Sequence, residues 1–491
     1  MFSRRRFLKT TMAGLASASL PFQPGQARAF SEARFTRDLA IPPLLQGEVD
    51  EQGIRHYDLT LRQGSMNFLG GQVTSTLGIN GDYLGPVIRM RRGEQVRLDV
   101  NNELGEASTL HWHGVHLPAA MDGGPHQVVA PGQTWSPRFQ VRQPASTQWY
   151  HSHRLHETGR QVYFGLAGLI YIDDDHADSL ALPSRYGVDD IPLVLQDRAF
   201  DEDGRFIYRS EPGPGMRGMM GDVMLVNGVV FPRLKVKHRR VRFRILNGSN
   251  ARIYNLEFSD RRRFLQIASD GGLLRRRVPL QRLRLAPGER AEIVVVFEWD
   301  DDVYLTDVTS ASTGGMGDVN DGGLGHLIHF DGKDIAPALA GPPPVELAEE
   351  IPTWKPRDAA RRRRFVLGGR GGRGRMQGGA LTINGKYMDM NRIDETVRRG
   401  DIEAWEIVNR SPMAHPFHVH DVQFRIHERN GVTPPPNERS LKDTVLVGPG
   451  ETVLLMMQFR DYADPDSPYM YHCHILEHED AGMMGQFVVT A

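Results

Sequence analysis

Three stretches of the chain repeat the same landmarks in the same order. Each opens with an Asn-Gly pair, at positions 80, 227 and 384, continues through alternating or β-branched residues, and later reaches a Pro-Gly pair, at positions 131, 287 and 449. The Asn-Gly pairs are 147 and 157 residues apart, so the repeat has the size of a domain and not of a solenoid unit. Runs such as 95–100, 241–246, 292–297 and 452–459 lie between turn residues and predict short β-strands. We therefore expect an all-β chain of three consecutive β-sandwich domains.

Turn-rich and proline-rich stretches indicate where these domains end. A loop near 181–184 closes the first repeat, and the proline-rich stretch 336–350 separates the second repeat from the third. The predicted division is a first domain at 30–180, a second at 181–335, a linker at 336–350 and a third domain at 351–491.

The first 29 residues have the three parts of an export signal. Residues 3–9 read SRRRFLK, residues 10–20 are weakly apolar, and Ala27-Arg28-Ala29 fits an A-x-A cleavage site. This order predicts a twin-arginine signal peptide that the twin-arginine export machinery recognises; the alternative is a basic tail. We expect a periplasmic protein without a membrane span, because no later stretch has roughly 18 uninterrupted apolar residues.

The charge balance disfavours a nucleic-acid partner. Removal of residues 1–29 takes away five basic residues and leaves 54 basic against 60 acidic ones, whereas a nucleic-acid-binding domain carries a basic surface. The chain has one cysteine, so it forms no internal disulfide. A free thiol in an oxidising compartment is exposed to oxidation unless it binds a metal.

That cysteine lies in a pattern with metal-ligand spacing. Cys473 is followed by His478 and Met483, five and ten residues further on. A blue-copper site combines two imidazoles, a thiolate and a weak axial thioether, and this spacing fits it. On a strand, His472 and His474 face away from Cys473. The tripeptide would then connect two metal centres.

Pairs of histidines spaced by one residue strengthen this interpretation. With 19 histidines in 491 positions, random placement gives about 0.7 His-x-His pairs. Four occur, at His111/His113, His151/His153, His418/His420 and His472/His474. A lone cysteine is more often a small buried hydrophobe and a lone histidine a structural residue, but chance does not produce this clustering. The pairs occupy only the first and third repeats, so we expect a metal site where those domains meet, with the second domain as a spacer.

These motifs resemble those of the three-domain multicopper oxidases, the laccase family, and the resemblance spans the mature chain. The run from His472 to Met484 is most similar to bacterial twin-arginine-exported oxidases of the copper-efflux type. The resemblance implies three cupredoxin-like Greek-key β-sandwiches and four copper ions: one type 1, one type 2 and a type 3 pair. It also implies an oxidoreductase that reduces dioxygen to water with electrons from a small-molecule donor.

The resemblance further implies a role for each motif residue. The type 1 ligands match His415, Cys473, His478 and axial Met483. The type 2 ligands match His111 and His418. One type 3 copper matches His113, His151 and His474, and the other matches His153, His420 and His472. Asp122 and Glu479 match acidic residues that relay protons; without the resemblance they would be interpreted as solvated turn carboxylates.

Two departures from the copper-efflux oxidases concern the donor. Their methionine-rich insert is replaced by the Gly/Arg loop 368–379, with Met376 as its one methionine, and an acidic residue that helps to bind cuprous ion corresponds to Ser411, although Met413 is kept. We therefore expect phenols and aromatic amines as donors and an edge of His478 that is open to bulky molecules. The alternatives are a cuprous oxidase for copper tolerance and, from another class, a non-enzymatic copper-binding protein or cell-division scaffold.

Overall fold

The computed structural model describes residues 35–209, 217–309, 323–335, 341, 343–348, 350–368 and 381–491. The predicted signal peptide, parts of the predicted linker, and all of the Gly/Arg loop except Gly368 lie outside the described residues. Their interpretations therefore stay predictions.

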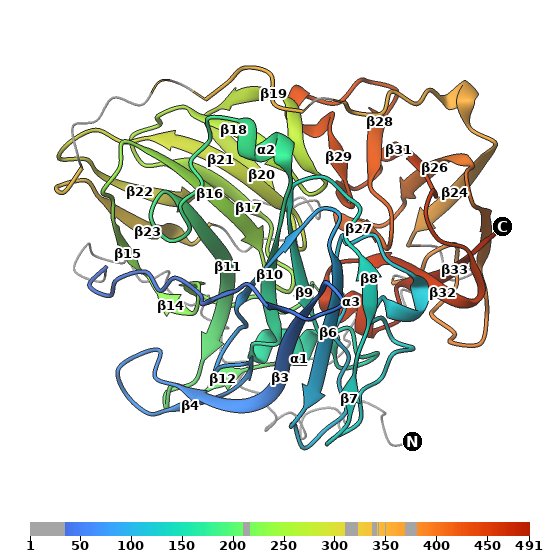
Figure 1. The fold of residues 1–491 in the computed structure, drawn as a ribbon. Coiled ribbons are helices and arrows are strands. Elements are labelled where there is room, and N and C mark those ends of the chain that lie inside the picture. Colours follow the sequence, from blue (N-terminus) through green and yellow to red (C-terminus); the bar gives the residue numbers. More distant parts are fainter. Residues whose placement is uncertain are drawn as a thin grey trace, which may run out of the picture. The chain divides into compact units, whose positions relative to one another are not determined.

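Six β-sheets build the described chain, and their strands come from three consecutive sections of sequence (Figure 1). The first section contains a four-stranded sheet of β1 (Leu44–Leu45), β5 (Val87–Arg91), β10 (Ala167–Asp173) and β9 (Ser146–His151). Its partner sheet contains β2 (Glu48–Val49), β3 (Ile54–Met66), β4 (Thr74–Ile79), β6 (Gln95–Asn102), β7 (Thr134–Trp135) and β8 (Arg138–Gln140).

The second section has the largest sheet. It consists of β11 (Asp190–Phe200), β12 (Phe206–Ile207), β13 (Val223–Val226), β14 (Val229–Val230), β16 (Arg240–Asn247), β18 (Phe264–Ser269), β19 (Gly272–Leu280) and β21 (Arg290–Val296). Its partner sheet consists of β15 (Arg233–Lys235), β17 (Tyr254–Phe258), β20 (Arg282–Leu285), β22 (Asp302–Asp307) and β23 (Gly325–Asp331).

The third section has two five-stranded sheets. One consists of β24 (Arg361–Leu367), β26 (Ile402–Asn409), β28 (Phe424–Arg429), β29 (Leu441–Lys442) and β31 (Thr452–Gln458). The other consists of β25 (Glu395–Arg398), β27 (His415–Val419), β30 (Thr444–Val447), β32 (Asp464–Cys473) and β33 (Met484–Thr490). The α-helices of the described chain are short: α1 (Thr158–Phe164), α2 (Asp175–Ser179) and α3 (Leu476–Asp480). None of them has the length and apolar character that a membrane crossing requires.

The repeated Asn-Gly pairs form the same turn three times. Asn80, Asn227 and Asn384 all have positive φ, at 56°, 52° and 54°, a conformation that asparagine tolerates better than most residues. In each turn the side-chain oxygen accepts a hydrogen bond from a strand amide, of Thr60, Val194 and Val366 respectively. The side-chain amide of each asparagine donates to a carbonyl of the same strand, two residues before that strand amide. These carbonyls belong to Asp58, Pro192 and Arg364 respectively. The repeat seen in the sequence is therefore a structural repeat.

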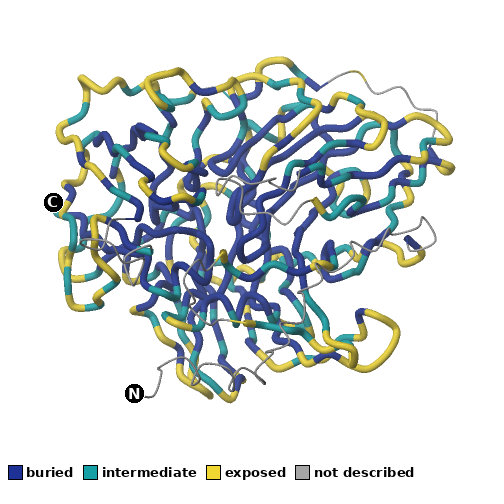
Figure 2. Tube along the Cα trace, turned by 180° about the vertical axis from the view of Figure 1, so that it is seen from behind, coloured by how far each residue is buried: buried dark blue, intermediate teal, exposed yellow. Residues whose placement is uncertain are grey.

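Each pair of sheets encloses its own apolar core. In the first section, Leu59 and Leu98 of one sheet share a buried cluster with Ile88 and Ile170 of the other. In the third, Phe365 and Trp405 share a cluster with Phe417, Tyr471 and Cys473. Figure 2 shows that buried backbone, in dark blue, fills the interior of the trace and that exposed loops surround it. The predicted all-β fold of three cupredoxin-like sandwiches is confirmed.

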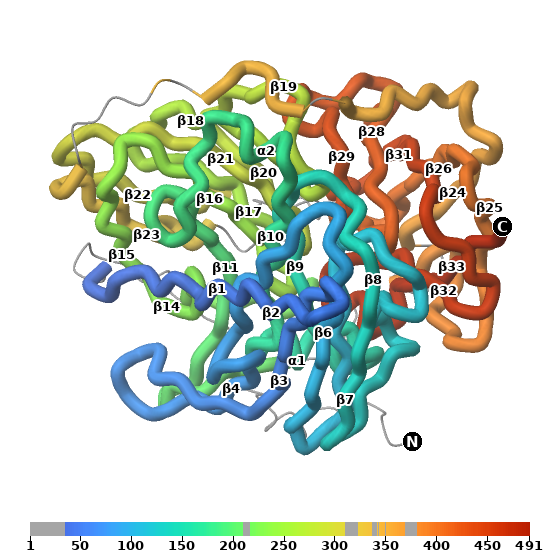
Figure 3. Tube along the Cα trace, in the orientation of Figure 1, coloured from blue at the N-terminus to red at the C-terminus, as the bar shows by residue number. Residues whose placement is uncertain are grey.

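The three sections also contact one another directly. Strand β9 of the first section contacts β18, β19 and β21 of the second, β19 contacts β29 of the third, and α1 contacts α3. Figure 3 follows the chain through the three sections in order. These contacts bring the carboxyl end of β9 to the ends of β27 and β32, where the histidine motifs lie.

Candidate metal centre

Cys473 ends β32 and lies against two imidazoles. Its Sγ is 3.4 Å from Nδ1 of His415 and 3.5 Å from Nδ1 of His478, and these two nitrogens are 3.3 Å apart. All three side chains are buried. Met483 is buried in the same apolar cluster, and its carbonyl accepts a hydrogen bond of 3.0 Å from the Cys473 amide. The four residues predicted for the type 1 site therefore occur together.

The other eight motif histidines form a second buried cluster. His111 and His151 are joined by two backbone hydrogen bonds of 2.8 and 3.1 Å, and β27 pairs with β32 so that His418 lies opposite His472. Only one member of each His-x-His pair lies in a strand or bridge, and the second member follows its end. The rings of a pair still enter the same cluster, with centroids 5.0–5.9 Å apart.

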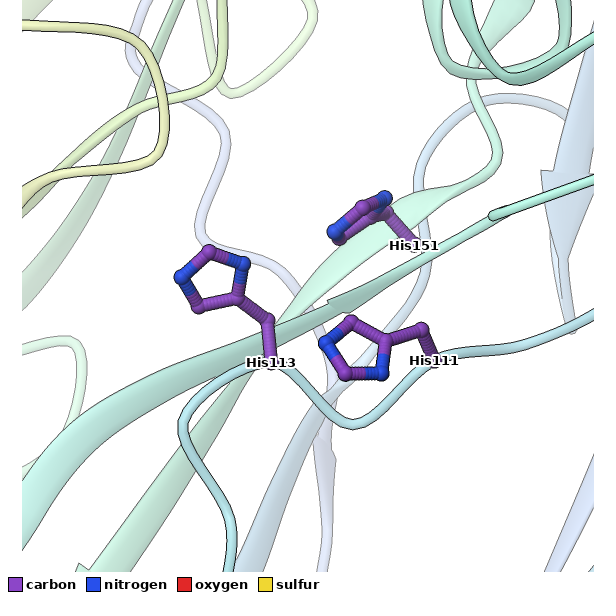
Figure 4. A group of neighbouring side chains, drawn as sticks. All are labelled: His111, His113 and His151. Atoms are coloured by element: carbon purple, nitrogen blue, oxygen red, sulfur yellow. The ribbon is translucent and has the colours of Figure 1, made fainter. Parts of the chain in front are cut away.

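Figure 4 shows three of these side chains, with His111 and His113 on one loop and His151 on the adjacent strand. Nδ1 of His111 donates to the carbonyl of Asp122 at 2.9 Å, and Nδ1 of His151 donates to the carbonyl of Ser152 at 2.8 Å. Their Nε2 atoms, and Nδ1 of His113, are buried without a hydrogen-bond partner in the described structure. Each ring thus has one nitrogen held in place and one left available.

A second group converges through nitrogen atoms alone. Nε2 of His472 lies 3.2 Å from Nε2 of both His153 and His420. A proton can bridge one such pair but cannot serve both. A cation about 2.0 Å from each nitrogen places ligands a little over 3 Å apart, which agrees with the observed spacing.

The predicted proton-relay residues contact the outer nitrogens of this group. Asp122 Oδ2 is 2.6 Å from Nδ1 of His420. The oxygens of Glu479 are 3.1 Å from Nδ1 of His153 and 3.2 Å from Nδ1 of His472. Both carboxylates are 1% exposed, so neither is a solvated turn residue. The hydrogen-bonded carboxylate of Asp122 fixes the orientation of the His420 imidazole and raises its basicity.

Burial sets the protonation state of the site. Desolvation lowers the pKa of His415, His418 and His474 well below the ordinary value, and it lowers that of His472 to about 3. These imidazoles are therefore neutral, which is the form that binds metals. Burial raises the pKa of the Cys473 thiol, so the thiolate that ligates a metal needs a cation beside it.

Asp443, which the sequence analysis did not single out, belongs to this site. Its Oδ1 is 3.0 Å from Nε2 of His113, and its backbone carbonyl accepts a 2.8 Å hydrogen bond from Nδ1 of His418. Arg290 of β21 binds both oxygens of its carboxylate, at 2.7 and 2.6 Å. A single sequence carries no signal for this contact, because the residues are far apart in the chain and belong to three sections.

The second section is more than the predicted spacer. Besides Arg290, it places Gly288 so close to His474 that a Cβ atom there would lie 2.9–3.0 Å from the imidazole ring. Gly288 has φ of +81°, so both its backbone and its missing side chain suit this position. The expectation that the second domain only sets the spacing between the others was therefore incomplete.

The surroundings of the Cys473 group bear on the electron donor. Ser411 places Oγ 2.7 Å from Nε2 of His415, at the position predicted to differ from the copper-efflux oxidases. His478 has no exposed surface. The expectation of an open His478 edge is therefore wrong for this structure, in which the ring is fully covered.

Five other histidines of the described chain lie outside both clusters and have polar partners there. His116 contacts Gln423, His126 contacts Gln486, His156 contacts the carbonyl of Asp480, His326 contacts Thr306, and His329 contacts Asp302.

Comparison with known proteins agrees with this geometry. Residues 60–177 and 354–491 match the multicopper oxidase family. The chain is 36% identical over 457 residues to multicopper oxidase mco of Staphylococcus aureus, covering 92% of each protein. It is 35% identical over 493 residues to the cell division protein FtsP of Xenorhabdus nematophila, covering 99% of this chain and 98% of FtsP. A laccase structure from Pediococcus acidilactici has a TM-score of 0.82 at 36% identity, covering 93% of this chain and 94% of the laccase.

The chain belongs to the multicopper oxidase family. Membership implies an oxidoreductase that uses copper ions, dioxygen and a reducing substrate. The residues present fit copper, because one thiolate and a large set of neutral imidazoles is the donor set that copper prefers. Bound copper would also satisfy ring nitrogens that have no partner in the described structure, since buried polar atoms without partners are costly unless an ion or a water satisfies them. These nitrogens belong to His111, His113, His151, His418 and His474.

Proposed function

We propose that this protein is a laccase-like multicopper oxidase with four copper ions. The type 1 ion would be held by His415, Cys473, His478 and Met483. The type 2 ion would be held by His111 and His418. The type 3 ions would be held by His113, His151 and His474, and by His153, His420 and His472. Bound copper supplies one-electron oxidation of the donor and four-electron reduction of dioxygen to water.

The observation that carries this proposal is the tripeptide His472-Cys473-His474. Cys473 lies with His415 and His478, while His472 lies with His153 and His420, and His474 lies 5.0 Å from His113 between ring centroids. One covalent segment therefore joins the Cys473 group, which would take electrons from the donor, to the group that would bind dioxygen. Electrons gain a path of bonded atoms between the two groups.

Within this scheme the chain's own carboxylates handle protons. Asp122 and Glu479 are buried and contact imidazoles of the eight-histidine cluster. Positioned carboxylates transfer protons to reacting groups in the transition state, and the reduction of dioxygen to water needs four. We propose these two residues as the local proton donors.

Organic donors are the proposed substrates, with phenols and aromatic amines as their class. The neutral hydroxyl of Ser411 next to His415 offers a weaker contact for a cuprous ion than a carboxylate does, because a negatively charged oxygen attracts a cation more strongly. Similarity to a laccase of known structure agrees with organic donors. Cuprous oxidation is the alternative. The test uses copper-loaded enzyme and measures kcat/KM for a dimethoxyphenol, once without and once with added cupric ion. The same enzyme is then assayed with cuprous ion as the donor, and the values of kcat/KM are compared.

Substantial phenol turnover without added copper is expected. Negligible turnover until copper is added, or a preference for cuprous ion by orders of magnitude, would replace the organic donors with cuprous ion.

We further propose that the protein reaches the periplasm through twin-arginine export, and that its domains are 30–180, 181–335 and 351–491. Loss of periplasmic protein on replacement of Arg4 and Arg5 by lysine would support this route.

Similarity to FtsP raises a second class, a cell-division protein. A scaffold has no need for eight buried imidazoles around one site, so the enzyme is the function that the geometry supports best. Purified protein that binds no copper and consumes no oxygen would favour the scaffold.

A further inference from the structure

We infer that Arg290 is a positioning residue for the proposed type 2 and type 3 copper ions, which together form a trinuclear cluster, and that it acts through Asp443. The inference rests on the proposed function, because it assigns His113 and His418 to that cluster. Arg290 belongs to β21 in the second section, which supplies none of the twelve proposed copper ligands. Through Asp443, Arg290 would give the second section a part in orienting the copper ligands.

The contact is a forked ion pair that is closed to water. Nη1 of Arg290 is 2.7 Å from Oδ1 of Asp443, and Nη2 is 2.6 Å from Oδ2. Both side chains are 0% exposed. Two parallel hydrogen bonds between a guanidinium and a carboxylate fix the rotation of the carboxylate as well as its position. Asp443 is therefore held in one orientation.

That orientation decides which nitrogen of His113 is available. Oδ1 of Asp443 accepts a hydrogen bond from Nε2 of His113 at 3.0 Å. The ring proton is kept on Nε2, and Nδ1 is left as the nitrogen without a partner. The backbone carbonyl of Asp443 holds the proton of His418 on Nδ1 in the same way, at 2.8 Å. One residue thus sets the tautomer of two proposed ligands.

The arginine is itself fixed from several directions. Its Nε donates to the carbonyl of Thr147 at 3.1 Å, its Nη1 donates to the carbonyl of Gly288 at 3.0 Å, and its Nη2 contacts Gln148. Thr147 and Gln148 belong to β9, the strand that ends at His151. Arg290 therefore ties the strand that carries a histidine of the first section to the aspartate of the third.

The backbone at Gly114 packs closely against this pair. A Cβ atom on Gly114, the residue after His113, would lie 2.5 Å from Oδ2 of Asp443 and 2.8 Å from Nη2 of Arg290. Gly114 also has φ of +83°. Both this backbone conformation and the lack of space for a Cβ atom favour glycine at this position. The backbone next to His113 therefore packs closely against the ion pair.

A matched buried pair in the same section provides the control. Arg244 of β16 binds both oxygens of Asp190, at 2.9 and 2.8 Å, and its Nη1 is 3.2 Å from Oγ1 of Thr147. Both residues are at most 3% exposed, and β16 pairs with β21. Neither Arg244 nor Asp190 has a hydrogen bond or ion pair with any of the proposed copper ligands among the described contacts.

The experiment compares Arg290→Lys with Arg244→Lys in the full-length protein. Lysine keeps the charge but loses the planar fork. Copper affinity is measured by competition with a chelator, type 2 copper by electron paramagnetic resonance, type 3 copper by near-ultraviolet absorption, and the Cys473 site by its visible band. For Arg290→Lys we expect cluster copper to bind about 10–100-fold more weakly, as for other residues that orient metal ligands, with altered type 2 and type 3 signals and an unchanged visible band.

Arg244→Lys should lower the thermal midpoint similarly but keep the parent copper affinity and spectra. Asp443→Asn serves as a second variant if Arg290→Lys does not fold, and the same loss of cluster copper is expected. Parent-like copper binding in the Arg290 and Asp443 variants, or equal loss in the Arg244 control, would overturn the inference. Failure of the parent protein to bind four copper ions would instead contradict the proposed function.

Discussion

Ser411 and His415 form a hydrogen bond in which a serine replaces the carboxylate expected from the copper-efflux oxidases. Oγ of Ser411 lies 2.7 Å from Nε2 of His415 and 3.0 Å from the carbonyl of Met413. Since the hydroxyl hydrogen goes to that carbonyl, the oxygen accepts the proton of the imidazole. Nδ1 of His415 is left facing Cys473. A neutral group therefore orients a proposed type 1 ligand.

Replacement of Ser411 by aspartate should lower the type 1 reduction potential. A negative charge stabilises the cupric form, and one unit charge about 6 Å away in a medium of effective dielectric about 20 changes the energy by about 3 kcal/mol, on the order of 100 mV. Redox titration of the visible band measures the shift. Ser411→Ala, which adds no charge, should show a much smaller change; equal shifts in both variants would mean that charge is not the cause.

Replacement of Cys473 by serine should abolish the blue colour and the oxidation of donors. The chain has no other thiol, and the intense visible band of a blue-copper site comes from its copper–thiolate bond. The eight-histidine cluster remains, so metal analysis should show loss of about one copper ion and retention of the others. Persistent blue colour in this variant would refute the assignment of Cys473.

Replacement of Glu479 by glutamine should slow dioxygen reduction about 10²–10⁴-fold, the usual contribution of a positioned proton donor. Reduction of the type 1 site by the donor should keep its rate, because Glu479 contacts His153 and His472 and not the Cys473 group. Asp122→Asn should behave alike. Stopped-flow measurement separates the two half-reactions.

Glu477→Gln is the matched control for this experiment. Glu477 is also buried on α3, but its carboxylate accepts hydrogen bonds from Asn250 and Tyr208 of the second section. It should not slow dioxygen reduction selectively. Equal slowing of both half-reactions by Glu479→Gln would indicate general damage in place of a proton role.

Replacement of Asp421 by asparagine should stabilise the copper-free protein at alkaline pH. Desolvation raises the pKa of Asp421 to about 7 from an ordinary value of 3.8. The folded state thus holds a proton that the unfolded state loses, and stability falls as the pH rises from about 4 through 7. Asparagine does not titrate and tolerates the φ of 68° at this position. Urea unfolding should show a larger gain in the free energy of unfolding at pH 8 than at pH 5, because the cost of the carboxyl grows between pH 4 and pH 7.

Much of the fold and of the candidate site could be predicted from the sequence. The Asn-Gly landmarks mark real turns because only a few residues tolerate positive φ, and the spacing around Cys473 is local enough for one segment to determine it. Asp443 and Arg290 could not be predicted, since their roles depend on how β21, β9 and β27 come together in space. The buried state of His478 was missed for the same reason: loop composition does not tell which atoms cover a ring.

The stoichiometry of oxygen consumption tests the central claim most directly. An oxygen electrode and a spectrophotometer together measure how many one-electron donor molecules are oxidised for each dioxygen consumed, and a peroxide assay runs beside them. Coupling of both copper groups through His472-Cys473-His474 predicts four donors per dioxygen, with water as the product and no peroxide. A ratio of two with equimolar hydrogen peroxide, or no oxygen uptake by copper-loaded protein, would contradict the account.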